Sequence, residues 1–137
     1  MGRRISADEA KDLMDQDGYV YVDVRSVPEF AAGHPTGAYN VPLLHMGPQG
    51  MAPNPKFMAA MEKAFAKDAK LIVACKGGGR SAQAAAMLEA SGFTNVVDQR
   101  AGFEGHAEPG WRPKGLPVST QAEAGRDWDA IAAKTKP

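Results

Sequence analysis

Short apolar runs divide the chain at intervals and predict buried strands. The clearest run, residues 71–74, reads Leu-Ile-Val-Ala, and residues 19–24 are rich in β-branched and aromatic side chains. Continuous apolar runs of this length are typical of strands that are covered on both faces of a sheet. Two further strands are predicted at residues 38–43 and 95–97.

Segments with apolar residues at every third or fourth position separate these runs and predict helices. Ser6 and Glu9 form a capping-box pattern before the first helix, which we expect to end near Asp15, before Gly18. The pattern Ser-Val-Pro-Glu at residues 26–29 predicts a short second helix that ends near Gly33. Three more helices are predicted, at residues 54–65, 81–91 and 123–134.

The alternation of strands and helices predicts an α/β fold, with a central, mostly parallel sheet and helices on both faces. A chain of 137 residues is long enough for one such domain and too short for two. Residues 33–53 and 102–117 are rich in Gly or loop-forming residues and are predicted to be mainly loops.

Composition and charge limit the classes of partner. Hydrophobic residues make up 44% of the chain and charged residues 23%, which is ordinary for a globular protein. The 16 basic and 16 acidic side chains balance, so any attraction for anions must be local. The longest apolar run, residues 71–75, is too short to cross a bilayer. We therefore expect neither nucleic acid nor a membrane as a partner.

A single cysteine, Cys75, rules out an internal disulfide, and the three histidines are scattered along the chain. No Cys/His cluster has the spacing of a zinc site, so we expect no metal. A free thiol suits a reducing compartment, which predicts a cytoplasmic location.

The most informative feature is the position of Cys75, directly after a predicted buried strand and before a predicted helix. Three consecutive glycines, Gly77, Gly78 and Gly79, lie in the connecting loop. Glycines allow successive N–H groups to point inward as an anion-binding nest, and the helix start adds its positive dipole end. These features favour a reactive thiolate. The alternative is a small buried residue that ends a strand before an ordinary turn.

Cys75 and the residues after it, Lys76-Gly77-Gly78-Gly79-Arg80-Ser81, resemble the active-site motif Cys-x-x-Gly-x-Arg-Ser/Thr/Ala of the rhodanese family. Upstream, residues 22–25 with Glu29-Phe30 and Gly33-His34 are similar to the family's first signature. Downstream, Gly92-Phe93, Gly102, Trp111 and residues 115–118 are similar to its closing segment. The resemblance runs from about residue 5 to 118 and predicts a rhodanese-like domain over residues 1–118. Residues 119–137 are expected to form a partly helical C-terminal extension.

The chain departs from the family's pattern at two places. Pro35 stands in a segment where the family usually has Gly-His-Ile-Pro-Gly-Ala, and it removes an N–H and fixes φ there. Ala101-Gly102 replaces the usual Gly-Gly pair. Neither departure lies in the loop after Cys75.

The resemblance implies a sulfurtransferase that needs no cofactor. Cys75 would take the outer sulfur of a small anionic donor such as thiosulfate as a persulfide. It would then pass that sulfur to cyanide, a thiol or a small-protein acceptor. Backbone amides of residues 76–81 would surround the persulfide, and Lys76 and Arg80 would orient the donor.

Two alternatives stay open at this point. Related phosphatases and arsenate reductases have five residues between cysteine and arginine, whereas four separate Cys75 from Arg80. A shorter ring leaves less room for a tetrahedral oxyanion, which favours sulfur. A non-catalytic module for partner binding or redox sensing is the second alternative, because a reactive thiol is also readily oxidised.

Several other residues have a structural and a functional interpretation. Asp23 and Arg25, at a strand end beside the expected site, could support it, but an ion pair that braces the strand is the preferred prediction. His34 is expected to be a structural loop histidine. Trp111 is expected to pack the closing segment. Met46 and Met51 could line the mouth of the site, although packing within their loop is preferred.

Overall fold

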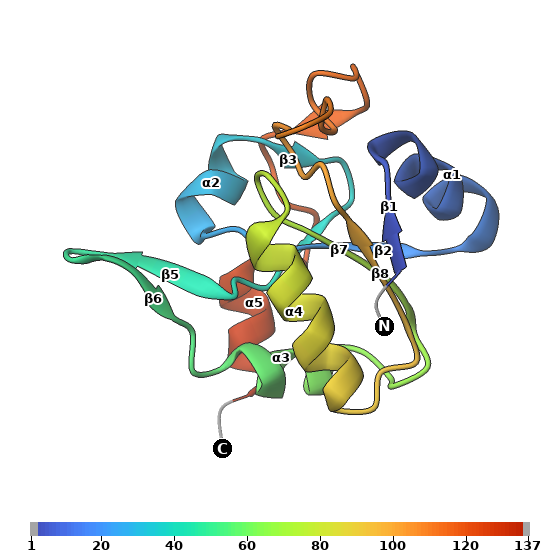
Figure 1. Cartoon of the computed structure of the whole chain (residues 1–137). Coiled ribbons are helices and arrows are strands. Elements are labelled where there is room, and N and C mark those ends of the chain that lie inside the picture. The colour runs from blue at the N-terminus through green and yellow to red at the C-terminus, as the bar shows by residue number, and fades with distance from the viewer. Residues whose placement is uncertain (1–2, 136–137) are drawn as a thin grey trace.

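The structure is a computed structural model that describes residues 3–135. At its centre is a five-stranded sheet in which every neighbouring pair is parallel (Figure 1). Because parallel strands need crossover connections, this arrangement requires helices between them, as the sequence predicts. The order across the sheet is β1 (Arg3–Ile5), β8 (Asn95–Gln99), β7 (Lys70–Ala74), β2 (Val20–Asp23) and β4 (Tyr39–Asn40).

Helices cover both faces of the sheet, which confirms the predicted α/β fold. Apolar residues of α1 (Ala7–Asp17) and α2 (Val27–Ala32) belong to the hydrophobic cluster on one face. The cluster on the other face takes residues from α3 (Phe57–Ala64), α4 (Gly79–Ala90) and α5 (Trp128–Ala133). Figure 1 shows α4 crossing in front of the sheet with α3 and α5 beside it.

Strand β7 shows how the sequence produces these two cores. Leu71 and Val73 pack into the cluster with α3, α4 and α5, whereas Ile72 and Ala74 pack into the opposite cluster. All four are at most 1% exposed. Successive side chains of a strand point to opposite faces, so a strand between two helical layers must be apolar throughout.

The first helix begins and ends as its sequence predicts. The Ser6 hydroxyl accepts a hydrogen bond from the Glu9 N–H at 3.1 Å, and the Glu9 carboxylate accepts one from the Ser6 N–H at 2.8 Å. Gly18 ends the helix with φ of 70°, a left-handed conformation that glycine adopts at little cost. Ser6 therefore fixes where β1 ends and α1 begins.

Several features differ from the sequence prediction, and the strand predicted at residues 38–43 is limited to β4, Tyr39–Asn40. Strand β1 was not expected, because two of its three residues are exposed arginines. Part of the predicted loop 33–53 forms a hairpin of β5 (Leu44–Gly47) and β6 (Gly50–Pro53), which projects from the body in Figure 1. Helix α5 is shorter than predicted. The segments β3 (His34–Pro35) and β9 (Val118–Ser119) pair antiparallel.

The C-terminal segment packs against the rest of the protein. Trp128 and Ile131 of α5 are 9% and 2% exposed and belong to the cluster that contains α3. The Arg126 carbonyl accepts a hydrogen bond from the Asn40 N–H at 2.9 Å, so this segment lies along the β4 edge of the sheet. Within residues 3–135, no helix combines the length and the apolar character required to span a bilayer.

Candidate active site

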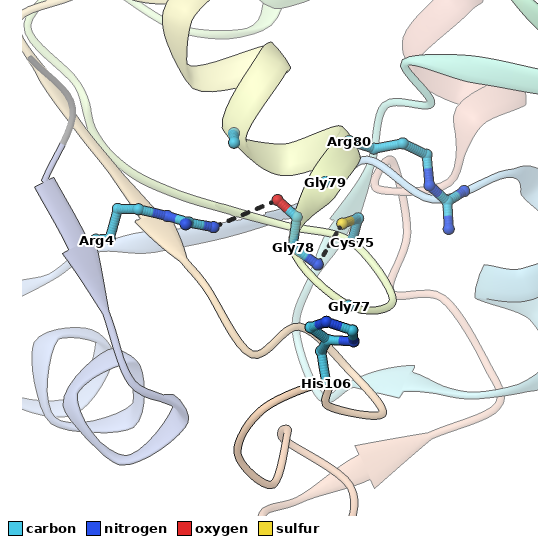
Figure 2. A pocket seen from close by; sticks show the side chains of 8 residues that line it. Arg4, Cys75, Gly77, Gly78, Gly79, Arg80 and His106 are labelled. Carbon is cyan, nitrogen blue, oxygen red and sulfur yellow. Dashed lines mark hydrogen bonds between the residues drawn. The ribbon is translucent and has the colours of Figure 1, made fainter.

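Cys75 follows β7 at the carboxyl end of the sheet and lies at the floor of an open cavity of about 630 Å³. The residue as a whole is only 2% exposed. Its Sγ accepts a hydrogen bond from the Gly78 N–H at 3.0 Å (Figure 2). The amide therefore points inward at the sulfur, as expected for a loop that stabilises negative charge there. The cavity is lined by Arg4, Cys75, Gly77, Gly78, Gly79, Arg80, Ala82 and His106.

The path of the loop depends on Gly78, which is the N-cap of α4. Its φ is 108°, in the left-handed region that side chains rarely adopt. A Cβ on Gly78 would also overlap the carbonyl oxygen of Arg100. Helix α4 begins at Gly79, two residues earlier than predicted. The first amides of a helix have no partner within it, so those of α4 are available beside the cavity.

Behind the loop, Ser81 and Asp98 form a buried hydrogen bond that sequence reasoning missed. The Ser81 hydroxyl donates to the Asp98 carboxylate at 2.5 Å and lies 3.7 Å from the Cys75 sulfur. Asp98 is 2% exposed and also accepts a hydrogen bond from Arg4 Nε at 2.8 Å. A carboxylate on β8, the strand next to the cysteine strand, was the signal that could have revealed this group.

On the other side of the loop, Arg80 forms a bidentate ion pair with Glu29 of α2. Its two terminal nitrogens donate to the two carboxylate oxygens at 2.7 and 3.1 Å. Burial alone would raise the pKa of Glu29, but hydrogen bonds from Arg80 and from the N–H and hydroxyl of Ser26 outweigh it and lower the pKa to about 2. The guanidinium thus holds α4 to α2. Arg80 borders the cavity without directing its terminal nitrogens to the sulfur, contrary to the expected role (Figure 2).

Lys76 lies elsewhere than the sequence predicts. Its side chain is exposed and lines a separate cavity of about 360 Å³, together with Arg25, Glu29 and Glu104 among others. The expectation that Lys76 orients a substrate beside Cys75 is therefore not supported. Adjacency in the sequence fixes the backbone of residue 76, but the residue lines the cavity beside Arg25 and Glu29 rather than the one that contains Cys75.

Asp23 and Arg25 form the predicted ion pair and are 1% and 4% exposed. Arg25 donates from Nε and Nη2 to the Asp23 carboxylate, at 2.7 Å for Nη2. Nη2 also donates to the Gly33 carbonyl at 2.6 Å, and the guanidinium lies 4.3 Å from the centroid of the Phe103 ring. These contacts join β2, the end of α2 and the loop after β8, so the pair supports the site as a brace.

His34 and Trp111 have the structural roles that the sequence predicts. His34 is buried, its Nδ1 donates to the Phe30 carbonyl at 2.7 Å, and its ring stacks on that of Phe30. The Trp111 indole N–H donates to the Pro117 carbonyl at 2.7 Å, and this ties down the closing segment. Met46 and Met51 instead face each other on the β5–β6 hairpin and are 55% and 42% exposed, so neither is packed as expected.

His106 and Arg4 were also missed, and both line the cavity that contains Cys75. His106 lies in the long segment between β8 and β9 and faces Gly77 in Figure 2. Neither residue belongs to a local sequence motif. Each is far from Cys75 in the sequence and is brought to the cavity by the folding of the chain. Within the described range 3–135, no three His, Cys, Asp or Glu side chains are grouped as metal ligands.

Comparison with known proteins places this geometry in a family. The rhodanese-like domain model matches residues 6–108. Thiosulfate sulfurtransferase 16, a chloroplastic protein of Arabidopsis thaliana, is 39% identical over 114 residues, which cover 83% of this chain and 90% of that protein. Rhodanese-like domain-containing protein 15, also chloroplastic and from Arabidopsis thaliana, is 38% identical over 75% of this chain. The match spans only 54% of that second relative.

Solved structures agree with the sequence comparisons. The crystal structure of Rv0390 from M. tuberculosis superposes with a TM-score of 0.74 and is 27% identical, covering 88% of this chain and 98% of that one. Residues 6–108, which the rhodanese-like domain model matches, contain the strand, the loop and the helix around Cys75. The chain belongs to the rhodanese-like domain family.

Proposed function

We propose that this protein is a thiosulfate sulfurtransferase that carries sulfane sulfur as a persulfide on Cys75. The observation that carries the proposal is the hydrogen bond from the Gly78 N–H to the Cys75 sulfur, at the floor of a cavity open to small molecules. An inward amide beside a helix start stabilises an anionic sulfur. The sulfurtransferase named among the relatives supports the same class of reaction.

The first half of the proposed cycle loads the cysteine. The Cys75 thiolate attacks the outer sulfur of thiosulfate and forms a new S–S bond. The S–S bond of the donor breaks, and sulfite leaves with its electron pair. The product is a Cys75 persulfide whose terminal sulfur carries the negative charge. The Gly78 amide at the start of α4 contacts the cysteine's own sulfur.

The second half unloads the sulfur. Cyanide or a thiolate attacks the terminal sulfur, the persulfide S–S bond breaks, and its electron pair returns to the Cys75 thiolate. Thiocyanate or an acceptor persulfide is released, with no net oxidation or reduction of the protein. The cycle uses no cofactor, and a cytoplasmic thiol or small protein is the proposed acceptor.

Loop length favours sulfur over phosphate or arsenate as the substrate. Four residues separate Cys75 from Arg80, and the side chain of Arg80 is engaged with Glu29. A tetrahedral oxyanion on the nucleophile requires a wider ring of amides and an arginine directed at it. The loop after Cys75 is one residue shorter than in those enzymes, and its arginine is paired with Glu29.

Mass spectrometry of the intact protein tests the proposal. After incubation with thiosulfate and removal of small molecules, we expect a mass gain of one sulfur atom that cyanide removes with release of thiocyanate. Replacement of Cys75 by serine should abolish the mass gain and lower thiocyanate formation by at least about 1000-fold, because the nucleophile is lost.

The same preparation separates the alternatives. A sulfur gain that persists in Cys75→Ser, or no gain in the wild type, would refute the persulfide. Hydrolysis of an aryl phosphate without thiocyanate formation would indicate a phosphatase. Addition of oxygen atoms alone, after peroxide treatment, would indicate a redox sensor.

A further inference from the structure

Arg4 lies on the wall of the cavity that contains Cys75, although it comes from the edge strand β1, far from the active-site loop in sequence. Its Nε donates to the buried Asp98 carboxylate at 2.8 Å, and its Nη2 lies 3.4 Å from the Gly78 carbonyl (Figure 2). The side chain is still 48% exposed. Asp98 thus holds the inner part of the guanidinium and leaves its outer part at the cavity.

The other two cations near the loop are placed differently. Both terminal nitrogens of Arg80 are hydrogen-bonded to Glu29, and Lys76 lines a different cavity. Among the described residues that line the Cys75 cavity, Arg4 is therefore the arginine or lysine whose terminal nitrogens are not hydrogen-bonded to a carboxylate. Nε of the Arg4 guanidinium is bonded to Asp98 and Nη2 makes only the long contact to the Gly78 carbonyl, so terminal N–H groups remain that suit the oxygen atoms of a sulfonate or sulfite group.

We infer that Arg4 binds the oxyanion end of a small anionic sulfur donor and so makes the site selective for such donors. This inference rests on the proposed function and adds the residue that recognises the donor. The Gly78 amide contacts the Cys75 sulfur that attacks the donor, while Arg4, on the wall of the same cavity, would face the oxygens of the group that leaves. Arg4 lies outside residues 6–108, the part of the chain that the family model matches.

Steady-state kinetics with thiosulfate as the donor test the inference. Arg4→Gln should raise the KM for thiosulfate by about 10-fold or more while kcat changes by less than about 3-fold, because a binding contact to the donor is lost. Arg4→Lys should recover part of the loss, since it restores the charge without the planar fork. The KM of the wild type should rise with ionic strength, and Arg4→Gln should flatten that dependence.

Arg3 provides a matched control on the same strand. It is exposed, carries the same charge, and its side chain points to the opposite face because strand residues alternate. Arg3→Gln should leave the KM and its salt dependence unchanged. Equal effects of Arg3→Gln and Arg4→Gln would overturn the inference, because general loss of charge would explain both.

Donor binding by Arg4 must also be distinguished from a purely structural role, in which Arg4 only neutralises Asp98. Removing Arg4 leaves Asp98 buried without its cation, which could distort the loop. The double variant Arg4→Gln/Asp98→Asn removes both charges and should still show the raised KM. Recovery of the wild-type KM in the double variant would show that Arg4 serves only to neutralise Asp98.

Direct binding distinguishes this inference from the proposed function. Calorimetric titration of thiosulfate into the Cys75→Ser protein measures donor binding where no persulfide can form. Adding Arg4→Gln to that background should weaken binding about 10-fold, and adding Arg3→Gln should not. If the wild type forms no persulfide yet this difference holds, the proposed function fails and the anion site stands. If the persulfide forms but the difference is missing, the anion site fails.

Discussion

The loop after Cys75 is held from two sides by different means. On the β8 side, defined by Arg4, Asp98 and Arg100, the protein contacts the loop backbone and the buried Ser81 hydroxyl. On the α2 side, defined by Ser26 and Glu29, the hydrogen bonds go to the long side chain of Arg80. The β8 side therefore acts on the loop backbone, and the α2 side acts on one side chain of the loop.

The β8 side determines where the loop amides point, because Gly78 packs closely against the Arg100 carbonyl and its own N–H donates to the Cys75 sulfur. The α2 side determines the position of the Arg80 guanidinium, because Glu29 directs it away from that sulfur. A small change on the β8 side should affect chemistry and stability together. A change on the α2 side should affect stability alone.

The largest effect is expected from Gly78→Ala. The new Cβ would overlap the Arg100 carbonyl oxygen, and alanine disfavours a φ of 108°. We expect a loss of about 2–4 kcal/mol in the free energy of unfolding, measured by urea denaturation. Persulfide formation should fall by at least about 10-fold, because the amide at the sulfur is displaced.

Gly79→Ala is the matched control for that variant. Gly79 is the first residue of α4, and a Cβ there would have no heavy atom within 4 Å. Its unfolding free energy should stay within about 0.5 kcal/mol of the wild type. If the two variants behaved alike, the loop would not be held on the β8 side as described.

A smaller effect is expected from Glu29→Gln on the α2 side. The amide keeps the shape of the carboxylate but loses its charge, so we expect a loss of about 1–2 kcal/mol in the free energy of unfolding. The KM for thiosulfate should stay within about 3-fold of the wild type. Glu62→Gln, in the exposed pair with Lys67, is the control and should cost less than about 0.5 kcal/mol. A strongly raised KM in Glu29→Gln would assign the α2 side to donor binding.

The same contrast explains what the sequence could predict. The Cys75 loop was found because its signals are local: an apolar strand, three glycines and a helix within a few residues. The capping boxes at Ser6 and Ser26 are local in the same sense. The bracing pair was also predictable, since Asp23 and Arg25 lie two residues apart. Each of these features depends on neighbours in the chain.

Arg4 was missed because its place depends on distant contacts. It is 94 residues from Asp98 in sequence, and the parallel pairing of β1 with β8 brings the two together. A strand of three residues with one buried side chain gives no apolar run to detect. The placements of Lys76 and Arg80 have a similar cause, since Arg80 pairs with Glu29 on α2 and Lys76 lines a cavity beside the same glutamate.

The smallest effect is expected from acid pH, which should weaken the ion pair on the α2 side and leave the close packing of Gly78 on the β8 side unchanged. The folded pKa of Glu29 is about 2, below its ordinary value of 4.5, so its ion pair stabilises the protein fully above about pH 4.5 and loses this contribution as the pH falls toward 2. The difference in unfolding free energy between wild type and Glu29→Gln, about 1–2 kcal/mol at pH 7, should therefore shrink between pH 5 and pH 3.

The Gly78→Ala penalty provides the internal reference for that titration. It arises from steric overlap and backbone strain, which do not depend on protonation, so it should stay constant over the same pH range. Denaturant unfolding of the three proteins at pH 7, 5 and 3 gives both differences. A Glu29→Gln penalty that stayed constant to pH 3 would mean that shape, rather than the charge of the carboxylate, joins α4 to α2.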